Sequence, residues 1–295
     1  MKFGILANTE KQGVGEVVEK LVSRFREENV DFVVQKELIS QIAKAARKGL
    51  TKRNSIDKNR LAAECDILIA LGGDGTILEV ARSTAQVGTP ILGVNFGKLG
   101  FLAEVSTEEL QDCITEILKQ DYLLIDRMMI EVSTRYKKKS YLALNDIVVD
   151  KFATSRVLDF ETYVDDEYLA TFSADGMIVS TPTGSTAYAL AIGGPILTPT
   201  NKSLIISPLS PHSLTARPVI VPDDSIVTIK VQHAPNKVHI TADGQEELLI
   251  SAPAEVSIRK SKWSAKLVKR KNTSYYEVLR KKLQWGRDIR YQSES

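Results

Sequence analysis

A glycine-rich segment, Gly72-Gly73-Asp74-Gly75-Thr76, stands in the middle of the stretch Cys65–Ala81. Before it, Asp66–Leu71 (DILIAL) is an almost wholly apolar run, typical of a strand buried on both faces, and a helical pattern begins at Ile77. A strand, a glycine-rich turn and a helix in this order present backbone N–H groups to a phosphate, because glycine lets the backbone approach a ligand closely. Asp74 is the exception, since a carboxylate repels phosphate unless it holds a metal or accepts a proton. The alternative is a tight turn in which Asp74 caps the helix.

Two further polar segments could bind a ligand. Asn145-Asp146 interrupts an apolar strand predicted at Tyr141–Val149, where an adjacent amide and carboxylate are costly unless they bind something. The alternative there is a strand end or bulge whose side chains are satisfied. In the second segment, Asp175–Ala191, the run Pro182-Thr183-Gly184-Ser185-Thr186 leads into an apolar helix. The N-terminus of that helix could hold a phosphate or a polar base edge, and the alternative is an ordinary capped helix. No single segment decides the function.

Other familiar motifs are excluded. Gly93–Leu99 has a Gly-Lys pair at P-loop spacing, but Leu99 stands where the metal-binding Ser or Thr must be. No serine lies in a nucleophile-elbow pattern. The two cysteines, Cys65 and Cys113, have no metal-ligand spacing and are predicted to be small buried residues in a reducing compartment. The histidines also lack the spacing of metal ligands: His212, His233 and His239.

Composition sets limits on the partners. The chain has 295 residues, enough for two domains, and its net charge of +2 gives no general drive towards nucleic acid or membrane. Basic residues cluster in Lys44–Arg60 and Lys260–Lys271, but such runs are usually solvated faces. Met1–Leu6 enters a strand-like run rather than a signal peptide, and no apolar stretch approaches membrane-spanning length. We therefore expect a cytoplasmic protein with no nucleic-acid and no membrane partner.

The first half of the chain alternates predicted strands and helices. The pattern predicts helices at Gly15–Glu28 and at Thr107–Leu118, the latter with Thr107 as N-cap, and a helix followed by a mobile loop in Lys36–Arg60. Besides Asp66–Leu71, strands are predicted at Lys2–Ala7, Phe32–Val34 and Pro90–Asn95. Repeated β-α units imply a Rossmann-like α/β domain with a mainly parallel sheet and ligands beyond its carboxyl edge.

From about Leu123 the pattern changes to many short strands separated by turn residues, which predicts a β-rich, sandwich-like second domain. Helices are predicted at Thr186–Ile192 and Tyr275–Leu283, and the stripe Tyr276, Leu279 and Leu283 on the latter needs an apolar partner. We therefore expect domains at 1–124 and 125–265, with a helix within 270–290 packing back on the first. The strands are predicted at Met129–Ser133, Tyr141–Val149, Val157–Val164, Glu167–Ser173, Gly176–Ser180, Ile226–Val231, Lys237–Thr241 and Ala254–Arg259.

The combined segments resemble the NAD kinase family in order and spacing. The resemblance spans roughly Lys2 to Gln284, and Thr181–Tyr188 (TPTGSTAY) is highly specific to that family, whereas Gly-Gly-Asp-Gly-Thr also occurs in lipid kinases and phosphofructokinases. The segments that carry it are Gly72–Thr76, Asn95–Phe101 (NFGKLGF), Asn145-Asp146, Ser173–Ile192 and Gly193-Gly194-Pro195. The family pairs an N-terminal α/β domain with a C-terminal β-sandwich domain. The resemblance therefore implies that 1–124 binds the phosphate donor and 125–265 binds NAD.

The resemblance further implies transfer of a phosphoryl group from ATP with a divalent metal, most simply Mg²⁺, to the 2′-hydroxyl of the adenosine ribose of NAD, giving NADP. Asp74 matches the general base. The residues that match NAD contacts are Asp74, Gly75, Phe101, Asn145, Asp146, Arg156, Asp175, Thr186, Ala187, Tyr188, Ala189, Leu190, Ala191 and Gln245. The residues that match the phosphate-donor loop are Gly72, Gly73, Gly75 and Thr76. The resemblance assigns no residues as metal ligands.

Several alternatives stay open. A homodimer or homotetramer is expected, since Asp175 matches a family position that reaches into a neighbouring subunit. Ser173 stands where some members of the family carry arginine, so the choice between NAD and NADH is open, as is that between ATP and polyphosphate. A lipid or sugar kinase would explain the glycine-rich segment but not Thr181–Ala191. A non-catalytic NAD-sensing module would be favoured by loss of the carboxylate at position 74, which is present.

Overall fold

The computed structural model describes residues 1–40, 42, 53–97, 100–103, 105–135 and 137–286, with residues 137–139 described by their backbone alone. The chain divides into two compact units, one made of Met1–Ile125 with the chain from Lys266 onward, the other of Asp126–Ala265. The chain passes from one unit to the other in two long strands, β7 (Leu123–Thr134) and β18 (Ala254–Lys269). That these units are a phosphate-donor domain and an NAD-binding domain stays a prediction.

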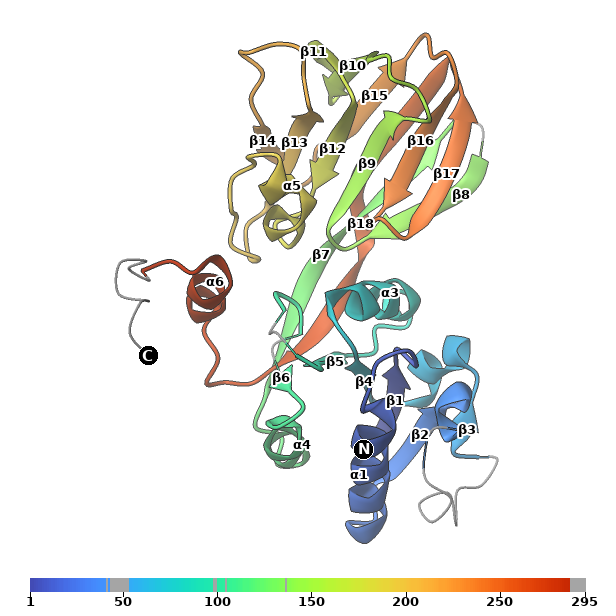
Figure 1. Cartoon of the computed structure of the whole chain (residues 1–295), viewed down its shortest axis with the longest axis vertical. Coiled ribbons are helices and arrows are strands. Elements are labelled where there is room, and N and C mark those ends of the chain that lie inside the picture. The colour runs from blue at the N-terminus through green and yellow to red at the C-terminus, as the bar shows by residue number, and fades with distance from the viewer. Residues whose placement is uncertain (41, 43–52, 98–99, 104, 136, 287–295) are drawn as a thin grey trace. The chain divides into compact units, whose positions relative to one another are not determined.

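The first unit contains a parallel sheet in the order β3-β2-β1-β4-β5 (Figure 1). Its central strands are apolar almost throughout because both faces of the sheet are covered. At the β5 edge, Ile91 pairs in parallel with Leu267, near the end of β18. The strands are β1 (Lys2–Ala7), β2 (Asp31–Gln35), β3 (Ser55–Ile56), β4 (Ile67–Leu71), β5 (Ile91–Asn95) and β6 (Val105–Ser106). This is the Rossmann-like α/β arrangement that the sequence predicts.

Helices cover both faces of this sheet. α1 (Val14–Glu27) buries the stripe Val18, Leu21 and Phe25, spaced by three and four residues, and the Phe25 ring stacks on Phe3 of β1 at 4.9 Å between centroids. α1 and α4 share one core cluster with β1, β4 and β5, whereas α3 packs against β5 through Ile77, which lies over Gly93. The other helices are α3 (Asp74–Thr84), α4 (Leu110–Leu118), α6 (Tyr275–Leu283) and two 3-10 helices, Lys36–Ser40 and Lys58–Glu64.

Two helix predictions need correction. α4 begins at Leu110, and Thr107 is not its N-cap, because Ser106 and Glu109 exchange two hydrogen bonds that close the preceding turn. In α6 the predicted bounds are right, but Tyr276 is 57% exposed and the buried residues are Val278 and Leu279. The loop predicted within Lys36–Arg60 falls largely on residues 41 and 43–52, which lie outside the described residues.

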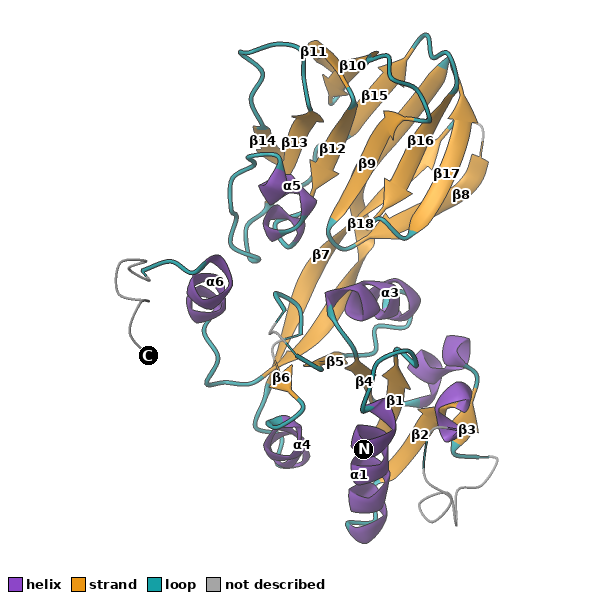
Figure 2. Ribbon diagram, viewed as in Figure 1, coloured by secondary structure: helices purple, strands orange, loops and turns teal. Residues whose placement is uncertain are grey.

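The second unit is a sandwich of two mainly antiparallel sheets (Figure 2). One sheet has the order β11-β10-β15-β18, with β7 on β18 and β8 on β7, and the other has the order β14-β13-β12-β9-β16-β17. Alternate residues of these strands form one core, which includes Phe160, Val179 and Ile240. The remaining strands are β8 (Lys137–Ala143), β9 (Asp146–Lys151), β10 (Leu158–Val164), β11 (Glu167–Ala174), β12 (Gly176–Ser180), β13 (Ser203–Leu209), β14 (Val219–Pro222), β15 (Val227–Val231), β16 (Lys237–Ala242) and β17 (Glu246–Ser251).

Three predicted elements differ from the strands and helices observed in this unit. The strand predicted at Tyr141–Val149 is two strands, since the chain bends at Leu144-Asn145 between β8 and β9. The helix predicted at Thr186–Ile192 is a 3-10 helix at Gly184–Thr186 and a single turn, α5 (Tyr188–Ala191), separated by the non-helical backbone of Ala187. The strand predicted to end at Arg259 continues to Lys269 as β18. Sequence patterning also missed β13, β14 and β17.

Both cysteines are free thiols, and they differ in burial. Cys113 is buried, whereas Cys65 is only partly so, and neither forms a disulfide. Burial raises the pKa of both thiols to about 12, which keeps them protonated and unreactive. No helix in the described ranges combines the length and the apolar character needed to cross a bilayer.

Candidate functional site

Asp74 is the first residue of α3, but its carboxylate does not bond to that helix. Oδ2 accepts the N–H of Phe101 at 2.9 Å, and Oδ1 accepts the N–H groups of Leu102 and Ala103 at 3.2 and 3.1 Å. The helix N-cap is Gly73, which has no side chain to cap it. The interpretation of Asp74 as a helix cap is therefore wrong. Its carboxylate is instead oriented by three amides of the loop that follows β5.

The glycine-rich segment before α3 is compact on one side and open on the other. A Cβ at Gly72 would lie 2.2 Å from the hydroxyl oxygen of Thr76, so Thr76 packs directly on that glycine. A Cβ at Gly73 would meet nothing within 4 Å. Gly75 is exposed and Asp74 half-buried. The first turn of α3 thus presents backbone, without side chains in the way, to an approaching anion.

Phe101 belongs to the same loop and is half-buried. The ammonium of Lys282, from α6, lies 5.8 Å from the centroid of the Phe101 ring, within the range of a cation–π contact. Helix α6 therefore contacts the loop that holds Asp74. Lys98 and Leu99, which are part of the predicted Asn95–Phe101 motif, lie outside the described residues.

In the second unit, a second aspartate holds the bend between β8 and β9. The Asp243 carboxylate accepts the N–H groups of Leu144, Asn145 and Asp146 at 3.0, 2.7 and 3.3 Å. Asp243 has φ +52° and Gly244 φ +62°, so both lie in the left-handed region of a tight turn after β16. Sequence reasoning missed Asp243 as a site residue. The available signal was the Asp-Gly turn pair directly before Gln245.

The Thr181–Thr186 segment packs on the same bend. Thr181 donates its hydroxyl to the Leu144 carbonyl at 2.6 Å and its N–H to the Asn145 carbonyl at 2.9 Å. A Cβ at Gly184 would lie 2.1 Å from the Asn145 carbonyl oxygen, so only glycine allows this approach. The structure therefore brings Asn145-Asp146, Thr181–Thr186 and Asp243 into one cluster, although they are far apart in sequence.

The segment after this cluster differs in exposure from residue to residue. Tyr188 and Ala191 are exposed, whereas Ala189 is wholly buried and packs inside the unit. Partial burial first, and then the charges of Asp150, Asp146 and Asp175, raise the pKa of the Tyr188 phenol. Thr186, Ala187 and Leu190 are half-buried.

Asp146 is an unusual carboxyl group because it is only 4% exposed. Burial first, and then the charge of Asp243, raise its pKa to about 7. Near neutral pH, Asp146 can therefore carry a proton and donate a hydrogen bond, or lose it and accept one. Such a group can hold a hydroxyl or an amide of a ligand in either role.

We expect Asp146 to make folding stability depend on pH. Its pKa is higher in the folded than in the unfolded chain, so its contribution is fully favourable below about pH 4 and is lost as the pH rises through about 7. Asp146→Asn should raise the free energy of unfolding at pH 8, by on the order of 1–4 kcal/mol, and change it little at pH 4. Urea unfolding of both proteins at the two pH values tests this, and an equal effect at both would contradict it.

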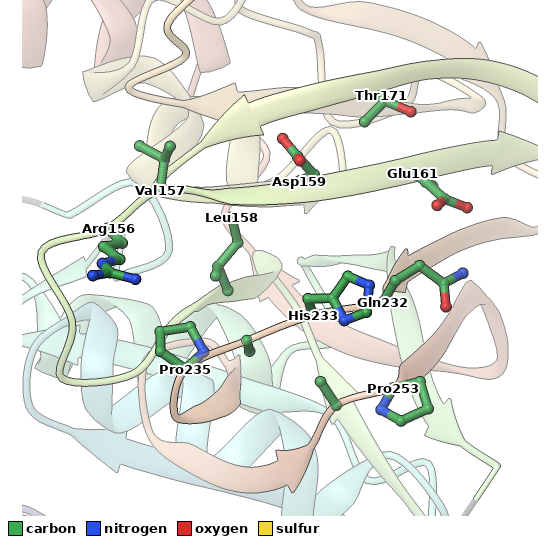
Figure 3. A pocket seen from close by; sticks show the side chains of 12 residues that line it. Arg156, Val157, Leu158, Asp159, Glu161, Thr171, Gln232, His233, Pro235 and Pro253 are labelled. Carbon is green, nitrogen blue, oxygen red and sulfur yellow. The ribbon is translucent and has the colours of Figure 1, made fainter.

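Three predicted NAD contacts lie beyond the cluster or at its edge. Asp175, between β11 and β12, forms an ion pair with Lys151 at 2.5 Å. Gln245 is exposed in the turn that contains Asp243. Arg156 lines a cavity of roughly 1030 Å³ together with Glu161 and His233 (Figure 3). The described residues that line this cavity include none from the bend or from Thr181–Ala191.

Comparison with known proteins gives matches that together cover most of the chain. Residues 3–122 match the family model of the ATP-NAD kinase N-terminal domain, and residues 144–270 that of the C-terminal domain. NAD kinases of Geotalea daltonii and Caldanaerobacter subterraneus are 38% and 40% identical to it over 263 and 285 residues. These alignments cover 88% and 96% of this chain and 93% and 98% of the relatives.

Two solved structures share the fold. A yeast NADH kinase complexed with NADH has a TM-score of 0.87 at 22% identity, covering 99% of this chain and 89% of that one. An NAD kinase from Archaeoglobus fulgidus in complex with ATP has a TM-score of 0.76 at 23% identity, covering 96% of this chain and 99% of that one. Both support the prediction of an α/β domain followed by a β sandwich.

Proposed function

The chain belongs to the NAD kinase family, and on that basis we propose that it transfers the terminal phosphoryl group of ATP to the 2′-hydroxyl of the adenosine ribose of NAD, with Asp74 as general base. The observation that carries this proposal is the Asp74 carboxylate, which three amides orient at the start of α3 inside a glycine-rich segment. A phosphate can approach the open backbone at Gly73, while Asp74 accepts the proton of the attacking hydroxyl.

The proposed step transfers one proton and one phosphoryl group. A bond forms between the ribose 2′-oxygen and the terminal phosphorus, the bond from that phosphorus to ADP breaks, and the hydroxyl proton passes to Asp74. A ribose hydroxyl is far less acidic than a carboxylic acid, so the proton leaves late. In a loose phosphoryl-transfer transition state this is sufficient, because orientation of the nucleophile matters more than its prior ionisation.

The proposed NAD contacts in the second unit are the bend and the segment that packs on it. Asn145 and Asp146 offer an amide and a carboxyl group on a backbone fixed by Asp243, and Tyr188 offers an exposed ring. The yeast relative binds NADH and the archaeal relative binds ATP, which supports use of the same two classes of nucleotide here. Arg156, Asp175 and Gln245 stay predicted contacts.

Divalent metal is proposed as part of the donor. Among the described residues, no group of three or more His, Cys, Asp or Glu side chains is arranged to hold a metal ion, so we assign no residue of this chain as a ligand. Mg²⁺ bound to the phosphates of ATP would neutralise charge on the transferred group. Every step assigned to the protein itself is a binding, orienting or proton-accepting step.

The proposal is tested by incubating the purified chain with NAD, ATP and Mg²⁺ and following NADP with an NADP-specific dehydrogenase. We expect NADP to accumulate with time and enzyme concentration. Parallel reactions with NADH, and with polyphosphate in place of ATP, determine the accepted substrate and donor. Phosphorylation of a lipid or sugar without phosphorylation of NAD would contradict the proposal, and binding of NAD without turnover would favour a sensing role.

We further propose that the active form is a homodimer or homotetramer. Asp175 matches a family position that completes the site of a neighbouring subunit, and β-rich domains commonly cover their sheet edges by self-association. Mixing inactive Asp74→Asn chains with inactive Asp175→Ala chains should restore part of the activity, because some hybrid sites then combine two intact halves. A fully active monomer by light scattering, or no recovery in well-mixed hybrids, would contradict this proposal.

A further inference from the structure

Gly100 lies directly against the Asp74 carboxylate. A Cβ at position 100 would lie 1.9 Å from Oδ1, 2.6 Å from Cγ and 2.9 Å from Oδ2 of Asp74. These are the three nearest atoms, and all belong to that one carboxylate. Gly100 is not among the described glycines whose φ lies in the left-handed region, so backbone conformation gives no separate reason for glycine here. The closest obstacle to a side chain at this position is therefore the Asp74 carboxylate.

The loop around Gly100 is shaped to present its amides. The Gly100 N–H donates to the Ala103 carbonyl at 3.2 Å, which closes the loop, and the next three N–H groups point to Asp74. The loop also rests on β5, where a Cβ at Gly93 would lie 3.2 Å from the Leu102 carbonyl oxygen and 3.3 Å from Ala103 Cα. Ile77 of α3 packs at the same glycine, 2.4 Å from that Cβ position, so the loop lies against both β5 and α3.

The hydrogen bonds distinguish the two carboxylate oxygens. Oδ1 accepts two N–H groups, whereas Oδ2 accepts one, from Phe101. A carboxylate oxygen can accept about two hydrogen bonds, so Oδ2 keeps the greater capacity to accept another. It is therefore the atom best able to receive a substrate hydroxyl.

We propose that Gly100 is a positioning residue for the reaction: it lets the loop 100–103 approach the Asp74 carboxylate and orient it so that Oδ2 receives the hydroxyl of the phosphoryl acceptor. The proposal rests on the role of Asp74 in the proposed function. Gly100 does not itself touch the substrate. It acts through Asp74, and its effect on turnover should disappear when the Asp74 carboxylate is absent.

A double-mutant cycle tests this in the full chain. Gly100→Ala forces the carboxylate away from its amides, and we expect kcat to fall about 10²-fold, since small misplacements of reacting groups have effects of that order. The dissociation constant of NAD, measured by calorimetry, should change less than about threefold. The apparent melting temperature should fall on the order of 5 °C, because the added methyl overpacks the site.

Asp74→Ala removes the three atoms nearest to a Cβ at position 100. Adding Gly100→Ala to Asp74→Ala should therefore leave the melting temperature unchanged. The residual kcat should change by less than about twofold. If Gly100→Ala alone does not fold, a double variant that folds still shows that the added methyl meets the Asp74 carboxylate, and a double variant that does not fold overturns the proposal. Gly97→Ala is the matched stability control in the same loop, since a Cβ there would meet nothing within 4 Å, and its melting temperature should equal that of the unchanged chain.

The outcomes separate this proposal from the proposed function. If Asp74→Ala keeps normal turnover, the role of Asp74 as base fails, and the positioning proposal fails with it, while the melting temperatures still report the steric contact. If Asp74→Ala loses turnover but Gly100→Ala keeps it, only the positioning proposal is overturned. If Gly100→Ala lowers the melting temperature equally in both backgrounds, the glycine serves folding and the positioning proposal is also overturned.

Discussion

Asp74→Asn should lower kcat by about 10²–10⁴-fold while leaving NAD binding and the fold nearly intact. General-base catalysis accelerates reactions by a factor of this order, and a side-chain amide cannot accept the hydroxyl proton. The fold should survive because the side-chain amide introduced by this substitution can place its oxygen at the Oδ1 position, where it keeps the hydrogen bonds from Leu102 and Ala103. Only the bond from Phe101 is lost, and its cost is small because Phe101 is half-buried and the freed N–H can bond to water.

Steady-state kinetics with NAD as the varied substrate, together with calorimetric NAD binding, measure this effect. Asp121→Asn is the matched control, since Asp121 is a 58% exposed member of a surface ion pair with Lys271, and such pairs contribute little. Its kcat should equal that of the unchanged chain. An Asp74→Asn chain with more than about a third of normal kcat would rule out the role assigned to Asp74.

Asp243→Asn should weaken both the second unit and its binding of NAD. The carboxylate accepts three backbone N–H groups at the bend, and an amide has a single oxygen to replace two. Leaving the N–H of Leu144, a wholly buried residue, opposite an NH₂ group should lower the free energy of unfolding by about 1–3 kcal/mol, more than the loss at the half-buried Phe101 in Asp74→Asn. Because this bend carries Asn145 and Asp146, we expect NAD affinity to fall by about tenfold or more.

Asp165→Asn is the matched control for this change. Asp165 also has a positive φ, of +50°, in a turn of the same unit, but within the described ranges its carboxylate accepts a single backbone N–H, that of Ile226 at 2.8 Å. Asparagine tolerates that conformation and keeps an oxygen for the single bond, so stability and NAD affinity should hardly change. Equal urea midpoints and NAD affinities for the two variants would contradict the role assigned to Asp243.

Sequence patterns were informative where structure depends on neighbours along the chain. The apolar run before Gly72 predicts β4, and the three-and-four spacing of Val18, Leu21 and Phe25 predicts α1. The predicted bounds of α6 are also right. Periodicity reports which face of a segment is apolar, and that face must be buried whatever it packs against. The order of β-α units and then short strands is sufficient to predict an α/β domain followed by a β sandwich.

Local patterns were less reliable where a tertiary contact decides the outcome. Tyr141–Val149 is apolar enough for one strand, but the chain bends between β8 and β9, where Leu144 and Asn145 donate their N–H groups to the Asp243 carboxylate. The alanine-rich run after Thr186 suits a helix, but the segment is tied at Thr181 and Ser185 and breaks at Ala187. In both places a contact with a distant part of the chain outweighs a weak local preference.

The chemical groups that this chain carries, and their order, follow from the sequence without any structure: the glycine-rich segment with its one carboxylate, the Asn-Asp pair and the Thr-Pro-Thr-Gly-Ser-Thr run. What holds these groups in place is visible only in the folded chain. Asp74 is oriented by amides 27 to 29 residues further along the chain, and the bend at Asn145 by a carboxylate 98 residues away. These hydrogen bonds depend on where strands and turns meet in space. The short periods of helices and strands in the sequence do not indicate which distant residues will come together.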